Sequence, residues 1–343
     1  MKGDEKMGLL SKAEPLVSII TSCYNGEKFI TDYFEMILKL EYSNLELYFV
    51  NDGSTDRTEE YVMPYIPLLE ERKIRFAYIK KENGGIASAI NCALPKIRGK
   101  YFFYPDVDDI IPPDSIRKKV QVLEDHPEYG FVIGQARIMD QDGRVTDTIV
   151  KMHHEGKRRD LIRDYIMEDN VLFWPGVFLL RTDSFCKINP QMQIYVNGPQ
   201  GGQNYQFLLP MIYHYPYGYL DEVVYLYRVY EESHSNNVHG VDAKIMRWGC
   251  HEHTILEVLK SISMTRVEQY HYQKMTRCKF ARQRMILYKR NYIGGKAIQK
   301  EFFKLLRYYS VDKNDIKIFL SCSFPNVKNL WKKLRKYKNG KDA

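Results

Sequence analysis

The chain has no pair of cysteines spaced Cys-x-x-Cys, and its six cysteines are scattered along 343 residues. This spacing argues against a structural zinc site and a disulfide framework, and it favours a reducing compartment. The longest apolar run, from Val171 to Leu180, contains Pro175 and Gly176 and is about half as long as a membrane-spanning helix. The first 14 residues are polar and charged, unlike a secretory signal peptide. We therefore expect a cytoplasmic protein, free or peripheral on the inner face of a membrane.

Glycine-rich phosphate loops of the two commonest kinds are also missing. The sequence contains neither a Walker A motif nor a G-x-G-x-x-G fingerprint. No recognised nucleic-acid-binding module is present either, and we expect no nucleic-acid partner. What the chain does have is tyrosine, 27 residues of it, and tyrosine-rich surfaces suit flat polar ligands such as sugars.

The net charge of +8 is divided unevenly along the chain. Residues 241–343 carry 24 basic and 8 acidic residues, whereas residues 1–240 carry 27 basic and 35 acidic residues. The two parts therefore have net charges of +16 and −8. This asymmetry predicts two regions with different partners, and we expect a domain at 1–240 followed by a basic helical extension at 241–343.

Short apolar runs alternate with helical patterns in the first third of the chain. The predicted strands are 15–23, 45–50, 74–79 and 101–104, and the predicted helices between them are 27–40, one beginning at Thr58, and 86–94. This alternation predicts an α/β fold with a parallel sheet and crossover helices. Polar residues follow each strand, at the edge where open α/β sheets bind ligands.

Three carboxylates follow the last of these strands. Asp106, Asp108 and Asp109 come directly after the aromatic run that ends at Tyr104 and Pro105. Carboxylates this close together need a cationic partner, and a hard divalent ion such as Mn²⁺ or Mg²⁺ with its phosphate ligand is one such partner. A solvated acidic turn is the alternative.

Four segments together carry a family resemblance. Val17–Asn25, Val50–Asp56, Asn83–Asn91 and Asp106–Asp109 resemble, in order and spacing, the nucleotide-binding half of the inverting glycosyltransferases of family two, which have the GT-A fold. The resemblance is strong over residues 15–112, thinner to about residue 240, and absent from the basic tail. It implies a Rossmann-like, mostly parallel sheet flanked by helices, a nucleotide-sugar donor and a bacterial polysaccharide as the product.

The resemblance also implies roles for individual residues. Asp108 is the expected direct metal ligand, with His234 as a further ligand, and Arg228 is expected to pair with phosphate. The residues expected to contact the nucleotide are Thr21, Tyr24, Asn25, Asp52, Asn83, Gly84, Asp106 and Arg228.

The chain departs from the family at the general base. The family uses a Glu-Asp pair at the start of a helix, and here Gln203 and Asn204 occupy those positions. Amides do not accept a proton near neutral pH. Three interpretations stay open: another carboxylate acts, with Asp164, Glu168 and Asp169 as candidates; the amides orient the acceptor; or the protein binds a sugar nucleotide without transferring the sugar.

Three further segments carry weaker hypotheses. Trp174 could stack on a sugar face or be a core residue, and His153–His154 is a weak metal candidate. The segment 324–338 interleaves Leu and Trp with Lys and Arg, a pattern typical of an interfacial membrane anchor.

These observations predict a metal-dependent, inverting hexosyltransferase. The expected donor is a nucleotide sugar, with UDP as the expected nucleotide, and the expected acceptor is a glycan or lipid-linked glycan in cell-surface polysaccharide synthesis. The alternative is a non-catalytic sugar-nucleotide-binding protein.

Overall fold

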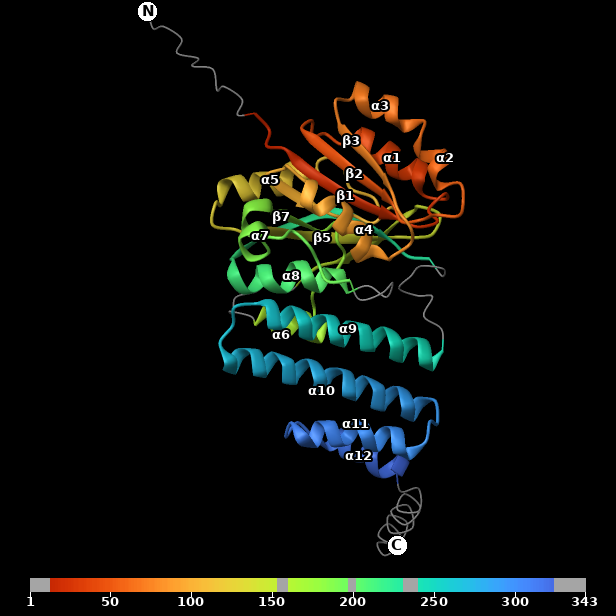
Figure 1. Ribbon diagram of the computed structural model, residues 1–343, viewed down its shortest axis with the longest axis vertical. Helices are drawn as coiled ribbons and strands as arrows, with labels where there is room; N and C mark the ends of the chain where they lie inside the picture. Colours follow the sequence, from red (N-terminus) through yellow and green to blue (C-terminus); the bar gives the residue numbers. More distant parts are fainter. Residues whose placement is uncertain (1–12, 153–159, 197–201, 231–239, 324–343) are drawn as a thin grey trace, which may run out of the picture. The chain divides into compact units, whose positions relative to one another are not determined.

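The computed structural model describes residues 13–152, 160–196, 202–230 and 240–323. The chain divides into two compact units, shown in Figure 1. The first unit contains the chain up to Val150 together with Phe173–Gln193 and Tyr215–Arg228. The second unit contains Lys151–Leu172, Ile194–His214 and the chain from Val229 onward.

The first unit is built on an eight-stranded mixed sheet. Its strand order is β3-β2-β1-β4-β7-β5-β6, and β8 pairs with β5 outside this path. Parallel pairing joins β1 to β2, β2 to β3, β1 to β4 and β5 to β8, whereas the pairs made by β7 and β6 are antiparallel. The strands are β1 (Val17–Cys23), β2 (Leu45–Asn51), β3 (Arg75–Lys80), β4 (Tyr101–Phe103), β5 (Phe131–Met139), β6 (Val145–Val150), β7 (Phe178–Arg181) and β8 (Tyr217–Arg228).

Helices accompany this sheet in the alternating order that the sequence predicts. They are α1 (Ile30–Lys39), α2 (Thr58–Val62), α3 (Tyr65–Glu71), α4 (Ile86–Ala93), α5 (Ser115–Asp125) and α7 (Thr182–Ile188). In α1 the buried residues Ile30, Tyr33, Phe34 and Ile37 follow helical spacing, so one face of the helix is apolar. The helix predicted from Thr58 is divided at Pro64, because proline lacks the N–H that would continue it.

The central strands are short runs of buried residues. Every residue of β2 is buried, and so is every residue of β1 except Ser22. Such runs are typical of strands covered on both faces. The structure confirms the predicted α/β class, and β7, which lies antiparallel between β4 and β5, is the feature that the alternating pattern did not predict.

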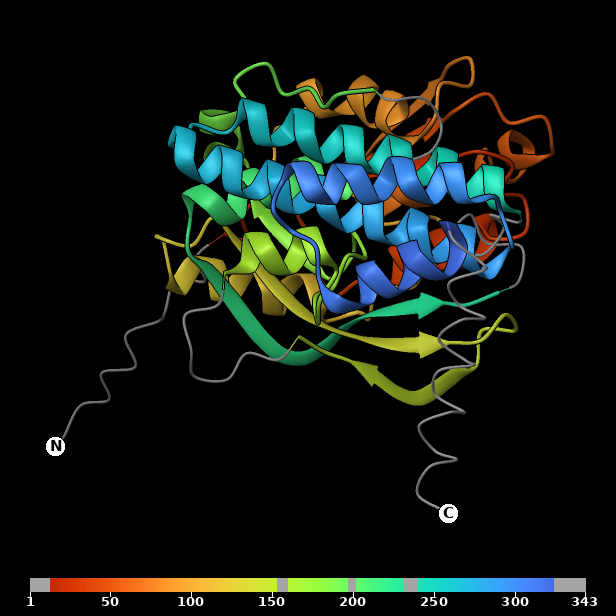
Figure 2. The same cartoon turned by 90° about the horizontal axis from the view of Figure 1, so that it is seen from below.

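The second unit is helical. It contains α6 (Leu161–Met167), α8 (Gln203–His214), α9 (Val241–Ser261), α10 (Arg266–Arg290), α11 (Gly295–Arg307) and α12 (Lys313–Ser323). Figure 2 shows α11 and α12 side by side. A capping box between Thr265 and Glu268 starts α10. None of the described helices combines the length and the hydropathy needed to cross a membrane.

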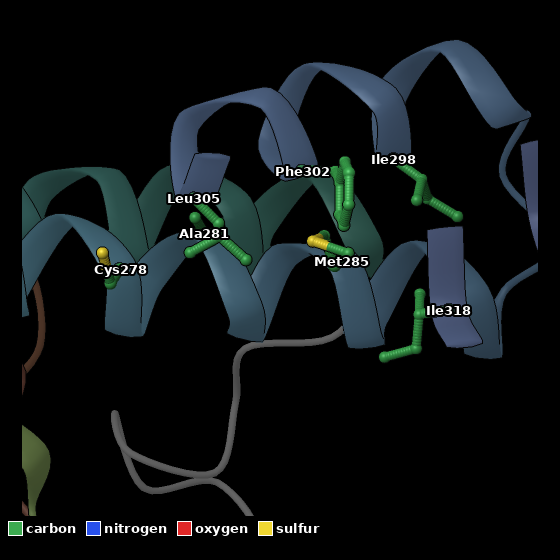
Figure 3. Close-up of a cluster of buried hydrophobic side chains, with 7 residues drawn as sticks. All are labelled: Cys278, Ala281, Met285, Ile298, Phe302, Leu305 and Ile318. Carbon is green, nitrogen blue, oxygen red and sulfur yellow. The ribbon is translucent and has the colours of Figure 1, made fainter. Parts of the chain in front are cut away.

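A hydrophobic cluster and a set of ion pairs hold the C-terminal helices together. Cys278, Ala281 and Met285 of α10 pack on Ile298, Phe302 and Leu305 of α11 and on Ile318 of α12 (Figure 3). Arg284, which is buried, pairs with Glu252 of α9 at 2.8 Å and with Glu301 of α11 at 3.1 Å. The predicted helical extension is therefore a packed helical region. Residues 151–172 and 194–214, which we expected in the first domain, lie in the second unit, and a domain boundary near residue 240 stays a prediction.

Candidate active site

The carboxyl ends of the strands that run parallel to one another meet at one edge of the first unit's sheet. β1, β2 and β4 are parallel, so the residues after Cys23, Asn51 and Phe103 lie on the same side. β5 runs with β4, because each is antiparallel to β7, and β8 is parallel to β5. The end of β8 at Arg228 therefore lies at this edge too. We call it the C-terminal edge.

Thr21 lies just before the end of β1 and is fully buried. Its hydroxyl donates to the carbonyl oxygen of Pro105 at 3.1 Å, and it therefore accepts from the Tyr33 hydroxyl at 2.6 Å. Thr21, predicted to contact the nucleotide, thus fixes the segment that carries Asp106. Its role toward a nucleotide stays a prediction.

Tyr24 and Asn25 follow β1. Tyr24 is 46% exposed, which leaves its ring available for stacking on a planar ligand. Asn25 has a positive φ of 53°, and its Oδ1 accepts from the backbone N–H of Thr55 at 2.8 Å. Its own N–H donates to Ser54 Oγ at 3.0 Å. Asn25 therefore joins the loop after β1 to the loop after β2.

Asp52 organises the glycine loop that precedes α4. Its carboxylate accepts from the backbone N–H of Gly85 at 2.7 Å and of Gly84 at 3.1 Å, and Lys81 Nζ lies 2.7 Å from Oδ1. Gly53, with φ 75°, allows this approach, since a Cβ there would lie 2.6 Å from the backbone nitrogen of Asn83. The structure thus brings together Asp52, Asn83 and Gly84, as predicted.

The acidic cluster lies directly after β4. Ligand atoms of Asp106, Asp108 and Asp109 are within 4.8 Å of one another. Burial, followed by the nearby Asp108 charge, raises the pKa of Asp106 and the pKa of Asp109 above the ordinary range. The negative charges of the three carboxylates destabilise one another. Such a set of oxygen ligands fits a hard divalent cation such as Mn²⁺ or Mg²⁺.

Protein groups from β8 use both carboxylate oxygens of Asp109. The Tyr225 hydroxyl donates to Oδ2 at 2.6 Å, and the backbone N–H of Arg228 donates to Oδ1 at 2.8 Å. Asp109 is 2% exposed, whereas Asp106 and Asp108 are half-buried. Asp106 and Asp108 would therefore be the direct ligands of a metal ion, and Asp109 would anchor their loop to β8.

Arg228 is buried at the end of β8. Its Nε donates to the carbonyl oxygen of Asp108 at 2.8 Å, and its Nη1 donates to the carbonyl oxygen of Gln141 at 3.2 Å. Nη2 pairs with Asp32 at 3.0 Å. The predicted phosphate partner is thus placed beside the acidic cluster, where its guanidinium holds the backbone of Asp108.

Tyr225, Asp32 and Lys81 were not singled out by the sequence analysis. Tyr225 lies 116 residues from its partner Asp109, and Arg228 lies 196 residues from Asp32. No local pattern links residues so far apart. Lys81 precedes the predicted Asn83–Gly84 loop by two positions, and a cation so near that loop would be the one available signal.

Trp174 stacks on Tyr227 with ring centroids 4.3 Å apart and planes 20° apart. Gly176, two residues later, faces the Tyr225 ring so closely that a Cβ would lie 1.8 Å from a ring carbon. The segment before β7 is therefore packed on β8. One face of the Trp174 ring is occupied by Tyr227, and sugar stacking by Trp174 stays a prediction.

The candidates for the general base lie in the second unit. Gln203 is buried and begins α8, followed by Asn204. The Tyr205 hydroxyl donates to Glu168 at 2.7 Å, so Glu168 is tied to the first turn of α8. Among the other carboxylates, Asp164 pairs with Arg163 at 2.6 Å, and Asp169 pairs with the same arginine at 3.4 Å.

Glu168 is the most constrained of these carboxylates. It has a left-handed φ of 56°, and Lys279 Nζ lies 2.6 Å from its Oε1. Burial raises the pKa of Glu168, but the Lys279 charge and the Tyr205 hydrogen bond outweigh burial, so the pKa lies below the ordinary range. His234 and the His153–His154 pair lie outside the described residues.

The sequence of the chain is similar to those of known proteins. The model of Glycosyl transferase family 2 matches residues 18–188. The uncharacterized glycosyltransferase RP339 of Rickettsia prowazekii (strain Madrid E) is 38% identical over 109 residues, 32% of each chain. TuaG of Bacillus subtilis (strain 168), a glycosyltransferase named for teichuronic acid biosynthesis, is 31% identical over 137 residues, 40% of this chain and 53% of TuaG. The matched region spans about a third of RP339 and about half of TuaG.

Solved structures share the fold over most of the chain. S. aureus TarS 1–349 in complex with UDP-GlcNAc superimposes with a TM-score of 0.59 at 16% identity, covering 91% of this chain and 92% of that one. The mannosyltransferase PcManGT from Pyrobaculum calidifontis, in complex with GDP-Man and Mn²⁺, gives a TM-score of 0.52 at 14% identity, with coverage of 95% and 83%. These similarities confirm the predicted GT-A fold and its helical C-terminal region.

Proposed function

Residues 18–188 belong to glycosyl transferase family 2, and from this premise we propose that the chain is a metal-dependent, inverting hexosyltransferase. The proposed donor is a UDP-sugar and the proposed acceptor is a glycan or lipid-linked glycan of a bacterial surface polysaccharide. Support for a nucleotide-sugar donor comes from TarS with UDP-GlcNAc and PcManGT with GDP-Man, and support for the biology comes from the name of TuaG.

One observation carries this proposal: Asp106 and Asp108 lie at the C-terminal edge, in a loop that buried residues hold in place. Asp109 anchors their loop through Tyr225, and Arg228 fixes the carbonyl of Asp108. A solvated acidic turn does not need this support, because exposed carboxylates are satisfied by water. This loop is held by a buried arginine and a buried tyrosine. Such support indicates a site that needs its side chains in fixed positions.

The residues at this edge divide the work of binding the donor. Tyr24 is exposed for stacking on the base, and Asp52 holds the backbone of Gly84 and Gly85 in place. Asp106 and Asp108 would hold the divalent ion. That ion, when bound, would supply Lewis-acid stabilisation of the departing diphosphate.

Acceptor activation needs a separate group. Glu168 is our candidate among the carboxylates of the second unit, because it is linked through Tyr205 to the turn where the family carries its acid pair. The amides of Gln203 and Asn204 would then orient the acceptor. Alanine substitution of both amides should lower turnover while leaving some, whereas a complete loss would assign them an essential role.

A non-catalytic sugar-nucleotide-binding protein is the second candidate function. The observation that favours it is the amide pair at Gln203 and Asn204, since neither side chain can act as a base. Contact of the basic tail, residues 324–338, with the inner face of a membrane is a further part of the proposal. That segment lies outside the described residues.

The full-length chain can decide between transfer and binding alone. It is incubated with Mn²⁺ and a panel of UDP-sugars, and UDP release is measured with and without a chelator. Metal-dependent release from one sugar of the panel supports the enzyme. Tight binding of UDP and Mn²⁺ by calorimetry, with no release from any sugar in the presence of membrane extract as acceptor source, supports the binding protein. Absence of both results rejects the donor site.

A further inference from the structure

Helices α11 and α12 carry large apolar side chains that stay exposed. Phe303 and Leu306 of α11 are 57% and 45% exposed, and Ile316 and Leu320 of α12 are 44% and 38% exposed. Phe303 packs edge-on against Phe319 with ring centroids 6.3 Å apart, which joins the two helices at this surface. Helical spacing of three and four residues places Leu306 beside Phe303 and Leu320 beside Ile316. We call these five residues the α11–α12 face.

Exposed cations lie on the same two helices as the α11–α12 face. The exposed ones on the two helices are Lys296, Lys300, Arg307, Lys313 and Lys317. Of the three acids in residues 291–323, Glu301 and Asp315 are buried and paired with Arg284 and Arg282, and only Asp312 is exposed. The face therefore combines an apolar centre with a positively charged border, and Tyr309, 95% exposed, follows α11.

The charge argues against two occupants of this face. A second copy of the chain packed on it would bring the same cations together. The chain's own segment 324–343 has 7 basic residues and 1 acidic residue, so it would meet the same repulsion. An anionic partner is required.

The apolar centre distinguishes among anionic partners. Nucleic-acid sites without base readout use cations with stacking aromatics, whereas Leu and Ile have no partner on a phosphate backbone. A lipid interface accepts both features, because aliphatic and aromatic side chains enter the acyl boundary while Lys and Arg stay at the headgroups. We propose that the α11–α12 face docks on an anionic bilayer surface. The α11–α12 face would bind the bilayer in addition to the tail segment 324–338, and its binding does not depend on the donor chemistry.

Vesicle co-sedimentation of the full-length chain tests the proposal. Vesicles of phosphatidylcholine alone are compared with vesicles that contain one-third phosphatidylglycerol, at low salt. Phe303→Ser combined with Leu320→Ser should lower the partition coefficient on the anionic vesicles about tenfold, because two side chains no longer enter the interface. Lys300→Glu combined with Lys317→Glu should lower it to a similar degree, since each charge near the surface contributes.

A matched control is available within the same unit. Val267 and Met246 are 79% and 61% exposed on α10 and α9, so Met246→Ser with Val267→Ser removes more exposed apolar side chains elsewhere and should leave partitioning unchanged. Equal partitioning of the wild type and both face variants would overturn the proposal and assign any binding to the tail. Binding to duplex DNA or single-stranded RNA that exceeds vesicle binding, and that the face variants reduce, would overturn it in favour of nucleic acid. Unchanged UDP and Mn²⁺ binding by the variants shows that any loss is confined to the face.

Discussion

The Tyr225 hydroxyl donates a hydrogen bond of 2.6 Å to Asp109 Oδ2, and both residues are buried. The tyrosine comes from β8 and the aspartate from the loop after β4, which also carries Asp106 and Asp108. A change at Tyr225 therefore reaches the candidate metal ligands without touching a metal ion or a nucleotide. This makes Tyr225 a positioning residue for the acidic cluster.

Tyr225→Phe should weaken Mn²⁺ binding about tenfold, because loss of a group that orients a ligand loop typically costs between about tenfold and a hundredfold in metal affinity. Calorimetry with Mn²⁺ and UDP measures the effect directly. Tyr217→Phe, at the other end of β8, is the matched control and should bind like the wild type. Equal affinities of Tyr225→Phe and the wild type would show that the hydrogen bond supports the fold alone.

Asp108→Asn should lower metal-dependent UDP release by at least about a hundredfold, because removal of a ligand charge removes most of the Lewis-acid contribution of the ion. Initial rates over a range of Mn²⁺ concentrations measure it. Asp125→Asn removes an exposed carboxylate at the end of α5 and should leave the rate unchanged. Wild-type turnover by Asp108→Asn would remove Asp108 from the site.

Glu168→Gln should destabilise the second unit by about 2 kcal/mol, because the Lys279 ammonium, 4% exposed, loses its carboxylate. The cost is smaller than for a fully buried pair, since the Glu168 side chain is 44% exposed. Urea unfolding of the full-length chain measures the change. Glu257→Gln breaks the exposed pair with Lys260 and should cost about 0.5 kcal/mol or less.

The double variant Glu168→Gln with Lys279→Met sharpens that test. It removes the stranded charge and should recover part of the lost stability. No recovery would show that Glu168 stabilises the unit through Tyr205 instead of through Lys279.

Lys119 should make stability rise with pH between about 7 and about 10. It is fully buried on α5, where its Nζ donates to the carbonyl oxygen of Gly176 at 2.9 Å and lies over the Phe103 ring. Burial lowers the pKa of Lys119 to about 7 from an ordinary value of 10.5. Between these two values the unfolded chain binds a proton that the folded chain does not, so raising the pH favours folding. Below pH 7 both states are protonated and the penalty is constant.

Denaturant unfolding at several pH values checks this sign. Lys119→Met removes the titrating group, so the difference in unfolding free energy between wild type and variant should change by up to about 1.4 kcal/mol per pH unit within the window. Lys118→Met is the control: hydrogen bonds to Asp114 and Glu222 raise the pKa of Lys118, so its titration lies above the window. Parallel pH profiles of wild type and Lys119→Met would contradict the buried-lysine account.

The local sequence pattern predicted well the strands and helices of the first third of the chain. The strands predicted at 15–23, 45–50 and 74–79 correspond to β1, β2 and β3, and the helix predicted at 86–94 corresponds to α4. Their apolar runs and helical periodicities are properties of consecutive residues, so sequence alone reveals them. The antiparallel pairing of β7 was not predicted, because its partners, β4 and β5, are set by contacts between distant segments.

The candidate site shows the same division. Asp52, Asn83, Gly84 and the acidic cluster follow strands, and the parallel order of those strands brings them to one edge, so their grouping was predictable. The contacts that hold these residues in place were not predictable. Asp109 contacts Tyr225, and Arg228 contacts Asp32, because β8 pairs with β5 in the sheet.

The sequence by itself determined the α/β class, the family resemblance and which acids could meet a metal ion, because these depend on residue type and spacing along short segments. Tertiary structure decided which acid of the cluster is held by β8, since that depends on hydrogen bonds across more than a hundred residues. It also decided which apolar residues of α11 and α12 face α10 and which stay exposed. Periodicity alone cannot make that choice, because a helix with apolar residues on two sides buries whichever side its neighbours cover.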